Sequence, residues 1–145
     1  MKEAIRQAKI AAVADEVPVG AVIVHERKII AKAHNQIETL KDPTAHAEMI
    51  AITQATNSLH RKWLQECTLY VTIEPCSMCA GALVLARIAR VCFGAKDPKT
   101  GACGSVVNIA DHRSLNHHIK VSGGILADEC AALVSEFFQK KRKAK

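Results

Sequence analysis

The sequence is poor in aromatic residues and has no long apolar run. Phenylalanine, tryptophan and tyrosine make up 3% of its 145 residues, although hydrophobic residues reach 49%, which is ordinary for an α/β protein. No stretch approaches the ~18 consecutive apolar residues that a transmembrane helix needs, so we expect no membrane span and no membrane partner. Residues 1–14 mix charged residues with alanines and lack the apolar core of a secretory signal.

Internal repeats, low-complexity blocks and interdomain linkers are also absent from the sequence. A chain of this length has room for one substantial hydrophobic core. We therefore expect a single domain over residues 1–145, located in the cytoplasm, with a basic tail at about residues 140–145.

A second Cys-x-x-Cys pair is missing, because only Cys76 and Cys79 have this spacing. The remaining cysteines are isolated from one another: Cys67, Cys92, Cys103 and Cys130. In a chain without a secretory signal, cysteines favour free thiols and metal ligands over disulfides. Cys67 and Cys92 fall in apolar stretches typical of strands, where buried thiols are expected.

Positive charge is in excess, with a net charge of +6. Part of it lies at the C-terminus, in Lys140, Lys141, Arg142, Lys143 and Lys145. Such an excess weakly indicates a phosphate-rich partner such as nucleic acid. For the tail alone, a solvated helix end is an equally good explanation.

Apolar periodicity and turn signals predict alternating helices and strands, which is typical of a layered α/β protein. The Asp42-Pro43-Thr44 run is interpreted as a helix start, with Asp42 as the cap. Helices are expected over residues 1–14, 42–56, 77–87, 106–110 and 126–137, and strands over 17–24, 29–33, 67–73, 89–94 and 119–121.

Two short motifs have the spacing of a zinc site. Cys76 and Cys79, three residues apart around an expected helix start, can face one ion, and His46 offers a third ligand. Three nitrogen and sulfur ligands with an open position are typical of catalytic zinc, whereas four protein ligands are typical of structural zinc. The alternatives are a structural site that recruits Cys67 or Cys103, and a redox-active thiol pair.

Glu48 lies two residues from His46 and need not bind the metal itself. It can instead lean over the open position and act as a general base towards water. Both motifs fall at expected helix N-termini, whose N–H groups would withdraw charge from the thiolates. Water on the zinc could then ionise near neutral pH.

Over nearly its whole length the sequence resembles the bacterial tRNA-specific adenosine deaminases of the cytidine deaminase-like superfamily. The resemblance lies in residues 16–22, 42–48, 68–72, 74–82, 93–97, 99–101 and 124–133. It implies a three-layer α/β/α sandwich with a five-stranded mixed sheet, which forms a homodimer. It also implies one Zn²⁺ per subunit, held by His46, Cys76 and Cys79, with Glu48 as the proton shuttle.

The resemblance further implies a set of substrate-binding residues, namely Asn35, Asp97, Val17, Pro18 and Ala47. In the family, Asn35 matches a base-contacting position and Asp97 a carboxylate beside the substrate ribose. Each has a simpler explanation, because Asn35 can satisfy a turn and Asp97 before Pro98 is ordinary turn chemistry. The adjacent His117 and His118 are interpreted as surface residues.

The implied reaction is hydrolytic deamination of adenosine to inosine at the wobble position of a tRNA anticodon, typically in an arginine tRNA. Zinc-bound hydroxide would attack carbon 6 while Glu48 moves protons, and no nucleotide cofactor is needed. A deaminase of a free base or nucleoside, such as guanine or cytosine, is the main alternative. A non-enzymatic RNA-binding module with structural zinc, or an inactive deaminase subunit, would have no use for Glu48.

Overall fold

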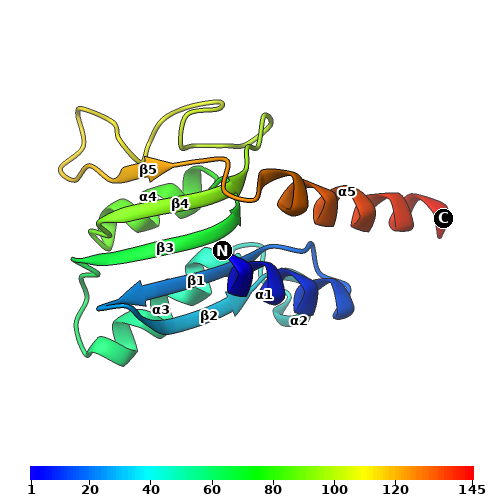
Figure 1. Cartoon of the computed structure of the whole chain (residues 1–145), viewed down its shortest axis with the longest axis horizontal. Coiled ribbons are helices and arrows are strands. Elements are labelled where there is room, and N and C mark those ends of the chain that lie inside the picture. The colour runs from blue at the N-terminus through cyan, green and yellow to red at the C-terminus, as the bar shows by residue number, and fades with distance from the viewer.

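A mixed five-stranded sheet forms the centre of the computed structural model, which describes all of residues 1–145 (Figure 1). Its strands are β1 (Gly20–His25), β2 (Lys28–His34), β3 (Cys67–Ile73), β4 (Arg90–Ala95) and β5 (Lys120–Ser122). They lie in the order β2-β1-β3-β4-β5. Strand β1 is antiparallel to β2 and β3, whereas β3, β4 and β5 run parallel to one another.

Helices cover both faces of the sheet (Figure 1). Helices α1 (Lys2–Val13) and α5 (Ala127–Lys143) pack on one face, and α3 (Ala47–Leu59) and α4 (Ser77–Leu85) on the other. The short α2 (Ile37–Leu40) connects β2 towards α3. The predicted three-layer α/β/α sandwich with a five-stranded mixed sheet is confirmed. None of the helices combines the length and apolar character that crossing a membrane requires.

The parallel pairing of β3 and β4 determines where a site can form. A parallel pair needs a crossover connection, and α4 supplies it. The carboxyl ends of β3 and β4 therefore meet at one edge of the sheet, where open α/β sheets bind ligands. Leu69 and Val71 of β3 are fully buried, as are the thiols of Cys67 and, nearly so, Cys92.

Two expectations about helices are wrong, and side-chain or loop hydrogen bonds explain both. Asp42 Oδ1 accepts hydrogen bonds from the N–H and the hydroxyl of Thr44, at 2.8 and 2.7 Å, so this run closes a turn. Helix α3 begins only at Ala47, with His46 as its N-cap residue. Residues 106–110 are not helical, because Val106 N–H donates to Gly101 O at 3.0 Å and Cys103 pairs with Asn108.

Two further differences concern the segments on either side of the first two strands. Strand β1 begins at Gly20 rather than Val17, since Val17 to Val19 form a loop. Helix α2 was not expected in the polar segment after Asn35. Both segments border the functional site described below.

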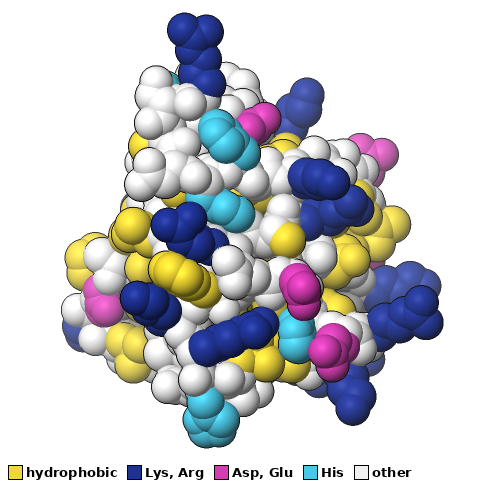
Figure 2. Space-filling view, turned by 90° about the vertical axis from the view of Figure 1, so that its left-hand side faces the viewer, with side chains coloured by type: hydrophobic (Ala, Val, Ile, Leu, Met, Phe, Trp, Pro, Cys, Tyr) yellow, Lys and Arg dark blue, Asp and Glu magenta, His cyan; other side chains and the backbone are white.

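Basic side chains are not confined to the C-terminus. The end of the molecule seen in Figure 2, which carries the β1–β2 turn, bears Lys and Arg side chains interspersed with His, Asp and Glu. The ring of Trp63 is flanked by the cationic groups of Lys62 and Arg87, each 4.8 Å from the ring centroid. Charge alone therefore does not single out one face for a phosphate-rich partner.

A substitution at Gly20 would test the close packing of α1 on β1. A methyl group on Gly20 would lie 2.6 Å from Ala8 N and 2.9 Å from Gln7 Cβ, so the helix would have to move away. Gly20→Ala is expected to lower the free energy of unfolding by about 1–3 kcal/mol, measured by chemical denaturation. Val13→Ala is the control, because this side chain of the same helix is 91% exposed. Equal stability of the two variants would contradict the close packing.

Candidate metal centre and substrate cleft

Three metal-ligating side chains converge where α3 and α4 begin. The Sγ atoms of Cys76 and Cys79 lie 3.7 and 3.5 Å from Nδ1 of His46. All three donor atoms lie within 4.8 Å of one another. His46 is the N-cap residue of α3 and Cys76 that of α4, with Cys79 in the first turn of α4. The structure thus brings together the three residues that the sequence predicted as ligands.

The spacing of these atoms fits a zinc ion. With Zn–S near ~2.3 Å and Zn–N near ~2.0–2.1 Å, a tetrahedral angle separates nitrogen and sulfur by about 3.6 Å. The observed separations of 3.5 and 3.7 Å match this value. No fourth protein ligand belongs to the cluster, and neither Cys67 nor Cys103 joins it. Three such ligands without a fourth are typical of a catalytic rather than a structural zinc site.

The pKa values of the two thiols shift in opposite directions. Hydrogen bonds with Cys79 and His46 lower the pKa of Cys76 to about 4. The hydrogen bond with Cys76, together with burial, raises the pKa of Cys79. Contact with Cys76 likewise raises the pKa of His46. A divalent cation held by the three donor atoms would stabilise both cysteines as thiolates.

Glu48 lies beside the cluster as the second residue of α3, with its side chain 2% exposed. It forms no ion pair with a lysine or arginine. Burial raises the pKa of its carboxyl group, against the opposing effect of His46. A buried carboxyl group next to three ligands is chemically suited to exchange protons with a molecule at the open position.

Asn35 links the end of β2 to the start of α3. Its Oδ1 accepts a hydrogen bond from the N–H of Ala47, the fully buried residue between His46 and Glu48, at 2.8 Å. Every fully buried side-chain nitrogen or oxygen has a partner, and Nδ2 of Asn35 has none in the protein. This Nδ2 group therefore reaches accessible space, where it can donate to a ligand.

Asp97 lies two residues beyond β4 and closes a turn. Its Oδ1 accepts from the N–H groups of Lys99 and Thr100, at 3.0 and 3.2 Å, and its Oδ2 from the Thr100 hydroxyl at 2.8 Å. These bonds form the turn that the sequence indicated as the simpler explanation of Asp97. Contact with a ribose stays a prediction, as do the pocket-wall roles of Val17 and Pro18.

The adjacent histidines do not form a second metal site. Nε2 of His117 contacts the carbonyl oxygen of Ile88, and Nδ1 of His118 lies 3.1 Å from Asp111 Oδ1. The only group of three or more potential ligands is the one at His46.

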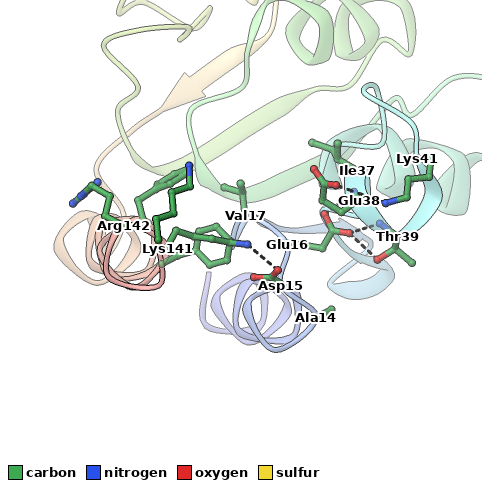
Figure 3. A pocket seen from close by; sticks show the side chains of 13 residues that line it. Ala14, Asp15, Glu16, Val17, Ile37, Glu38, Thr39, Lys41, Lys141 and Arg142 are labelled. Atoms are coloured by element: carbon green, nitrogen blue, oxygen red, sulfur yellow. Dashed lines mark hydrogen bonds and ion pairs between the residues drawn. The ribbon is translucent and has the colours of Figure 1, made fainter.

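A cleft of about 780 Å³ opens beside Val17 (Figure 3). It lies between the α1–β1 loop, α2 and the C-terminal half of α5. Phe137 and Phe138 line it, with ring centroids 5.4 Å apart in an edge-on arrangement. Its basic lining residues are Lys41, Lys141, Arg142 and Lys145. The sequence showed the basic tail but not its association with the two aromatic rings and Lys41.

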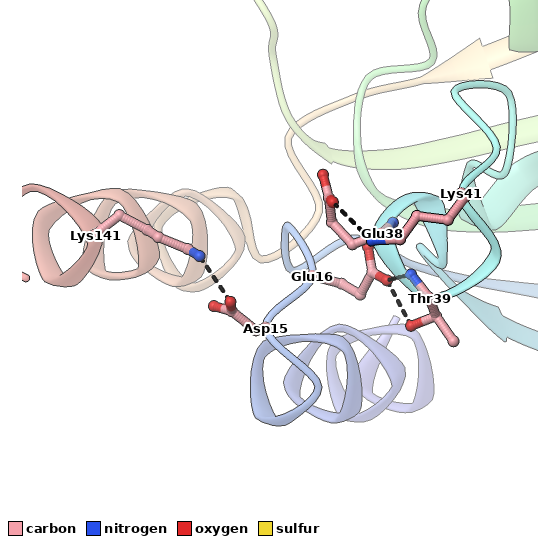
Figure 4. Close-up of polar contacts among 6 residues, drawn as sticks. All are labelled: Asp15, Glu16, Glu38, Thr39, Lys41 and Lys141. Atoms are coloured by element: carbon pink, nitrogen blue, oxygen red, sulfur yellow. Dashed lines mark hydrogen bonds and ion pairs between the residues drawn. The ribbon is translucent and has the colours of Figure 1, made fainter.

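Two contacts hold the walls of this cleft together (Figure 4). Glu16, which is 1% exposed, accepts hydrogen bonds from the N–H groups of Glu38 and Thr39, at 3.0 and 2.7 Å, and from the Thr39 hydroxyl at 2.7 Å. Lys141 Nζ lies 2.8 Å from Asp15 Oδ2 and so ties α5 to the α1–β1 loop. Sequence reasoning missed Glu16, because its partners are distant in sequence.

The hydrogen bonds to Glu16 predict a pH-dependent contribution to stability. Burial opposes ionisation of Glu16, but the bonds from Thr39 and Glu38 prevail and lower its pKa. The ionised group therefore stabilises the fold above its unfolded-state pKa of about 4.3, and the stabilisation is lost as pH falls through the folded-state pKa. Glu16→Gln should lower the free energy of unfolding near neutral pH by about 1–3 kcal/mol. Denaturation at about pH 3 should show a smaller difference, and an equal difference would contradict this account.

The bond from Ala47 to Asn35 predicts an effect on metal binding. Asn35→Ala removes the acceptor that orients the start of α3 and should weaken zinc binding by about 10- to 100-fold, measured by competition with a chromophoric chelator. Asn108→Ala is the control, because Asn108 accepts only from Asp111 N–H in an exposed turn. Equal zinc affinities for the two variants would show that Asn35 does not support the metal centre.

Comparisons with known proteins agree with the geometry. The family model of MafB19-like deaminases matches residues 1–142. A tRNA-specific adenosine deaminase of Aquifex aeolicus (strain VF5) is 55% identical over 142 residues, which cover 98% of this chain and 93% of that protein.

Solved structures show the same similarity. One, from a study of A-to-I editing by tRNA:A34 deaminases at the wobble position of transfer RNA, has a TM-score of 0.88 and 41% identity, covering 92% of this chain and 96% of that one. Guanine deaminase from Bacillus subtilis has a TM-score of 0.63 and 42% identity, covering 66% of this chain and 61% of that one. The tRNA:A34 deaminase structure has the higher TM-score and nearly complete coverage, and the Aquifex relative covers nearly the whole chain. This chain therefore belongs to the family of tRNA-specific adenosine deaminases.

Proposed function

We propose that this protein is a zinc-dependent hydrolase that converts adenosine to inosine at the wobble position of a tRNA anticodon. One arrangement carries the proposal: three ligands with an open fourth position, and buried Glu48 beside them. The tRNA-specific relatives supply the substrate class. An arginine tRNA and a cytoplasmic location are part of the proposal.

The proposed chemistry adds water and releases ammonia. Zinc, when bound, activates a water molecule for attack on carbon 6 of adenine. Glu48 would take one proton from this water and deliver it to ring nitrogen 1, and would then pass the remaining hydroxyl proton to the amino group, which leaves as ammonia. Asn35 holds the first turn of α3 through Ala47 and directs its free Nδ2 group at the base.

An anticodon loop suits such a site because its bases are unpaired and can turn outward at low cost. The neighbouring cleft offers Phe137 and Phe138 for base stacking, and Arg142 and Lys145 for phosphates. Val17 and Pro18 would form the wall between this cleft and the target base. Asp97 would lie beside the target ribose.

The homodimer is proposed to form through the outer face of α3 and α4. An apolar groove there is lined by Met49, Met78, Gly81, Ala82, Leu85 and Leu115. Leu85 is 80% exposed, and nothing lies within 4 Å of a methyl group placed on Gly81. A second copy of the chain would remove this apolar surface from water.

A deaminase of free bases is the second candidate, favoured by the similarity to guanine deaminase. Ammonia release by zinc-loaded protein distinguishes the two on a small panel: a stem-loop with adenosine at the wobble position, the same loop with guanosine there, free adenosine, cytidine, cytosine and guanine. The proposal expects turnover of the adenosine stem-loop alone. Turnover of a free base would refute the proposal that tRNA is the substrate. Inactivity towards the whole panel with zinc bound would refute the proposal that the protein is a deaminase.

Removing the proposed proton shuttle should separate chemistry from binding. Glu48→Ala is expected to lower kcat on the adenosine stem-loop by about 100- to 10,000-fold, because proton transfer by a positioned group contributes this much. Zinc content and stem-loop affinity should change little, which metal analysis and a binding titration measure. Glu26→Gln, an exposed glutamate in the β1–β2 turn, is the control. Normal turnover by Glu48→Ala would show that Glu48 is not the proton shuttle.

A further inference from the structure

Glu74 follows β3 directly, and its side chain is 2% exposed. Its Oε1 accepts a hydrogen bond from the N–H of Asp97 at 3.1 Å, and its Oε2 from the N–H groups of Cys103 and Ser105, at 3.0 and 3.1 Å. The Ser105 hydroxyl also donates to Oε1. All these donors belong to one segment, residues 97–105, which follows β4.

No cation accompanies this buried carboxylate, since Glu74 takes part in no ion pair. Burial opposes ionisation, but the hydrogen bonds from Ser105, Asp97 and Cys103 prevail and lower the pKa of Glu74. An ionised carboxylate only accepts hydrogen bonds, and the 97–105 segment presents only donors to it.

The same segment is attached to the turn that carries the metal ligand Cys76. Ala102 N–H donates to Pro75 O at 2.8 Å, and Gly101 pairs with Cys76 as an isolated bridge. A methyl group on Gly101 would overlap the carboxyl group of Glu74, so this position needs glycine for close approach. Glu74 thus joins Asp97 to the metal-binding edge of the sheet.

We propose that Glu74 is a positioning residue, which holds Asp97 where its carboxylate can accept a hydrogen bond from the 2′-hydroxyl of the target nucleotide. The inference rests on the proposed function, in which Asp97 lies beside the ribose. Glu74 fixes the backbone of Asp97, while Lys99 and Thr100 fix its side chain. A displacement of about 1 Å at a positioned group is enough to lose such a contact.

The substitution Glu74→Gln removes the hydrogen bond from Asp97 N–H selectively. Oε2 faces two backbone N–H groups that cannot act as acceptors, so the amide oxygen has to occupy the Oε2 position. The NH₂ group then occupies the Oε1 position. There the Ser105 hydroxyl can reverse and accept from it, but the N–H of Asp97 cannot. Glu74→Gln therefore releases Asp97 and retains the other contacts of the segment.

The test compares two stem-loops that carry adenosine or 2′-deoxyadenosine at the wobble position and are otherwise identical. The parent protein should prefer the ribose substrate, and Glu74→Gln should lower the ratio of the two kcat/KM values by about 3- to 10-fold. Asp97→Ala should lower it at least as far, and the double variant no further than Asp97→Ala. An unchanged ratio in Glu74→Gln, or independent losses in the double variant, would overturn the inference.

Glu16→Gln is the control, because Glu16 is an equally buried carboxylate that accepts from two N–H groups and a hydroxyl of α2, whereas Glu74 accepts from three N–H groups and a hydroxyl of the 97–105 segment. It should lose stability without changing the ribose-to-deoxyribose ratio, and an equal fall in the ratio would reduce Glu74 to a general structural role. If Glu74→Gln does not fold, Glu74→Asp replaces it, since the shorter carboxylate keeps its charge but cannot span the same donors.

Hydrogen exchange of the substrate-free protein measures the hydrogen bond from Asp97 N–H to Glu74 directly. The Asp97 amide should exchange faster in Glu74→Gln than in the parent protein, with the Cys103 and Ser105 amides unchanged. Unchanged protection of the Asp97 amide would overturn the inference. A parent protein that deaminates neither stem-loop refutes the proposed function itself, whereas an active parent whose ratio is insensitive to Glu74 refutes only the positioning role.

Discussion

The metal centre depends on two helices that begin at the same edge of the sheet. His46 and Cys76 are the N-cap residues of α3 and α4, so the ligands lie beside the N–H groups of both helix ends, of which that of Ala47 donates to Asn35 Oδ1. These N–H groups offset part of the negative charge that two thiolates bring to a cation. The parallel pairing of β3 with β4, and the packing of α3 beside α4, fix this arrangement. Asn35 and Glu74 then anchor the adjoining segments to it by hydrogen bonds.

Two buried glutamates, Glu16 and Glu74, each organise a loop at this end of the protein. Each accepts only from neutral N–H and hydroxyl groups, so these contacts, unlike the ion pair of Lys141 with Asp15, do not depend on charges that salt would screen. The contacts proposed for RNA are of the opposite kind, because Arg142 and Lys145 would bind phosphate, and this binding would weaken as salt rises. Basic side chains also cover the far end of the molecule (Figure 2), and Lys62 and Arg87 flank Trp63. The cleft differs in lining one hollow with two aromatic rings, Phe137 and Phe138, together with its basic residues.

Local patterns were enough to predict the ligand cluster and most of the elements. Cys76 and Cys79 were recognisable from their spacing, and β3 was predicted with its observed bounds. Asp42 was misassigned because a side chain that can cap a helix can equally close a turn two residues ahead, and here it does so with Thr44. The roles of Glu16 and Glu74 were not predictable, since their partners come from other parts of the chain and leave no periodic signal. The cleft formed by α2 and α5 was missed for the same reason.

In the proposed reaction, water activated at this site replaces the amino group of one adenosine in an RNA loop. The most direct measurement is mass spectrometry of an anticodon stem-loop after turnover by zinc-loaded protein in water enriched in heavy oxygen. The wobble nucleotide alone should become inosine and carry the heavy oxygen at carbon 6. Product without heavy oxygen, or conversion of adenosines elsewhere in the loop at the same rate, would contradict it.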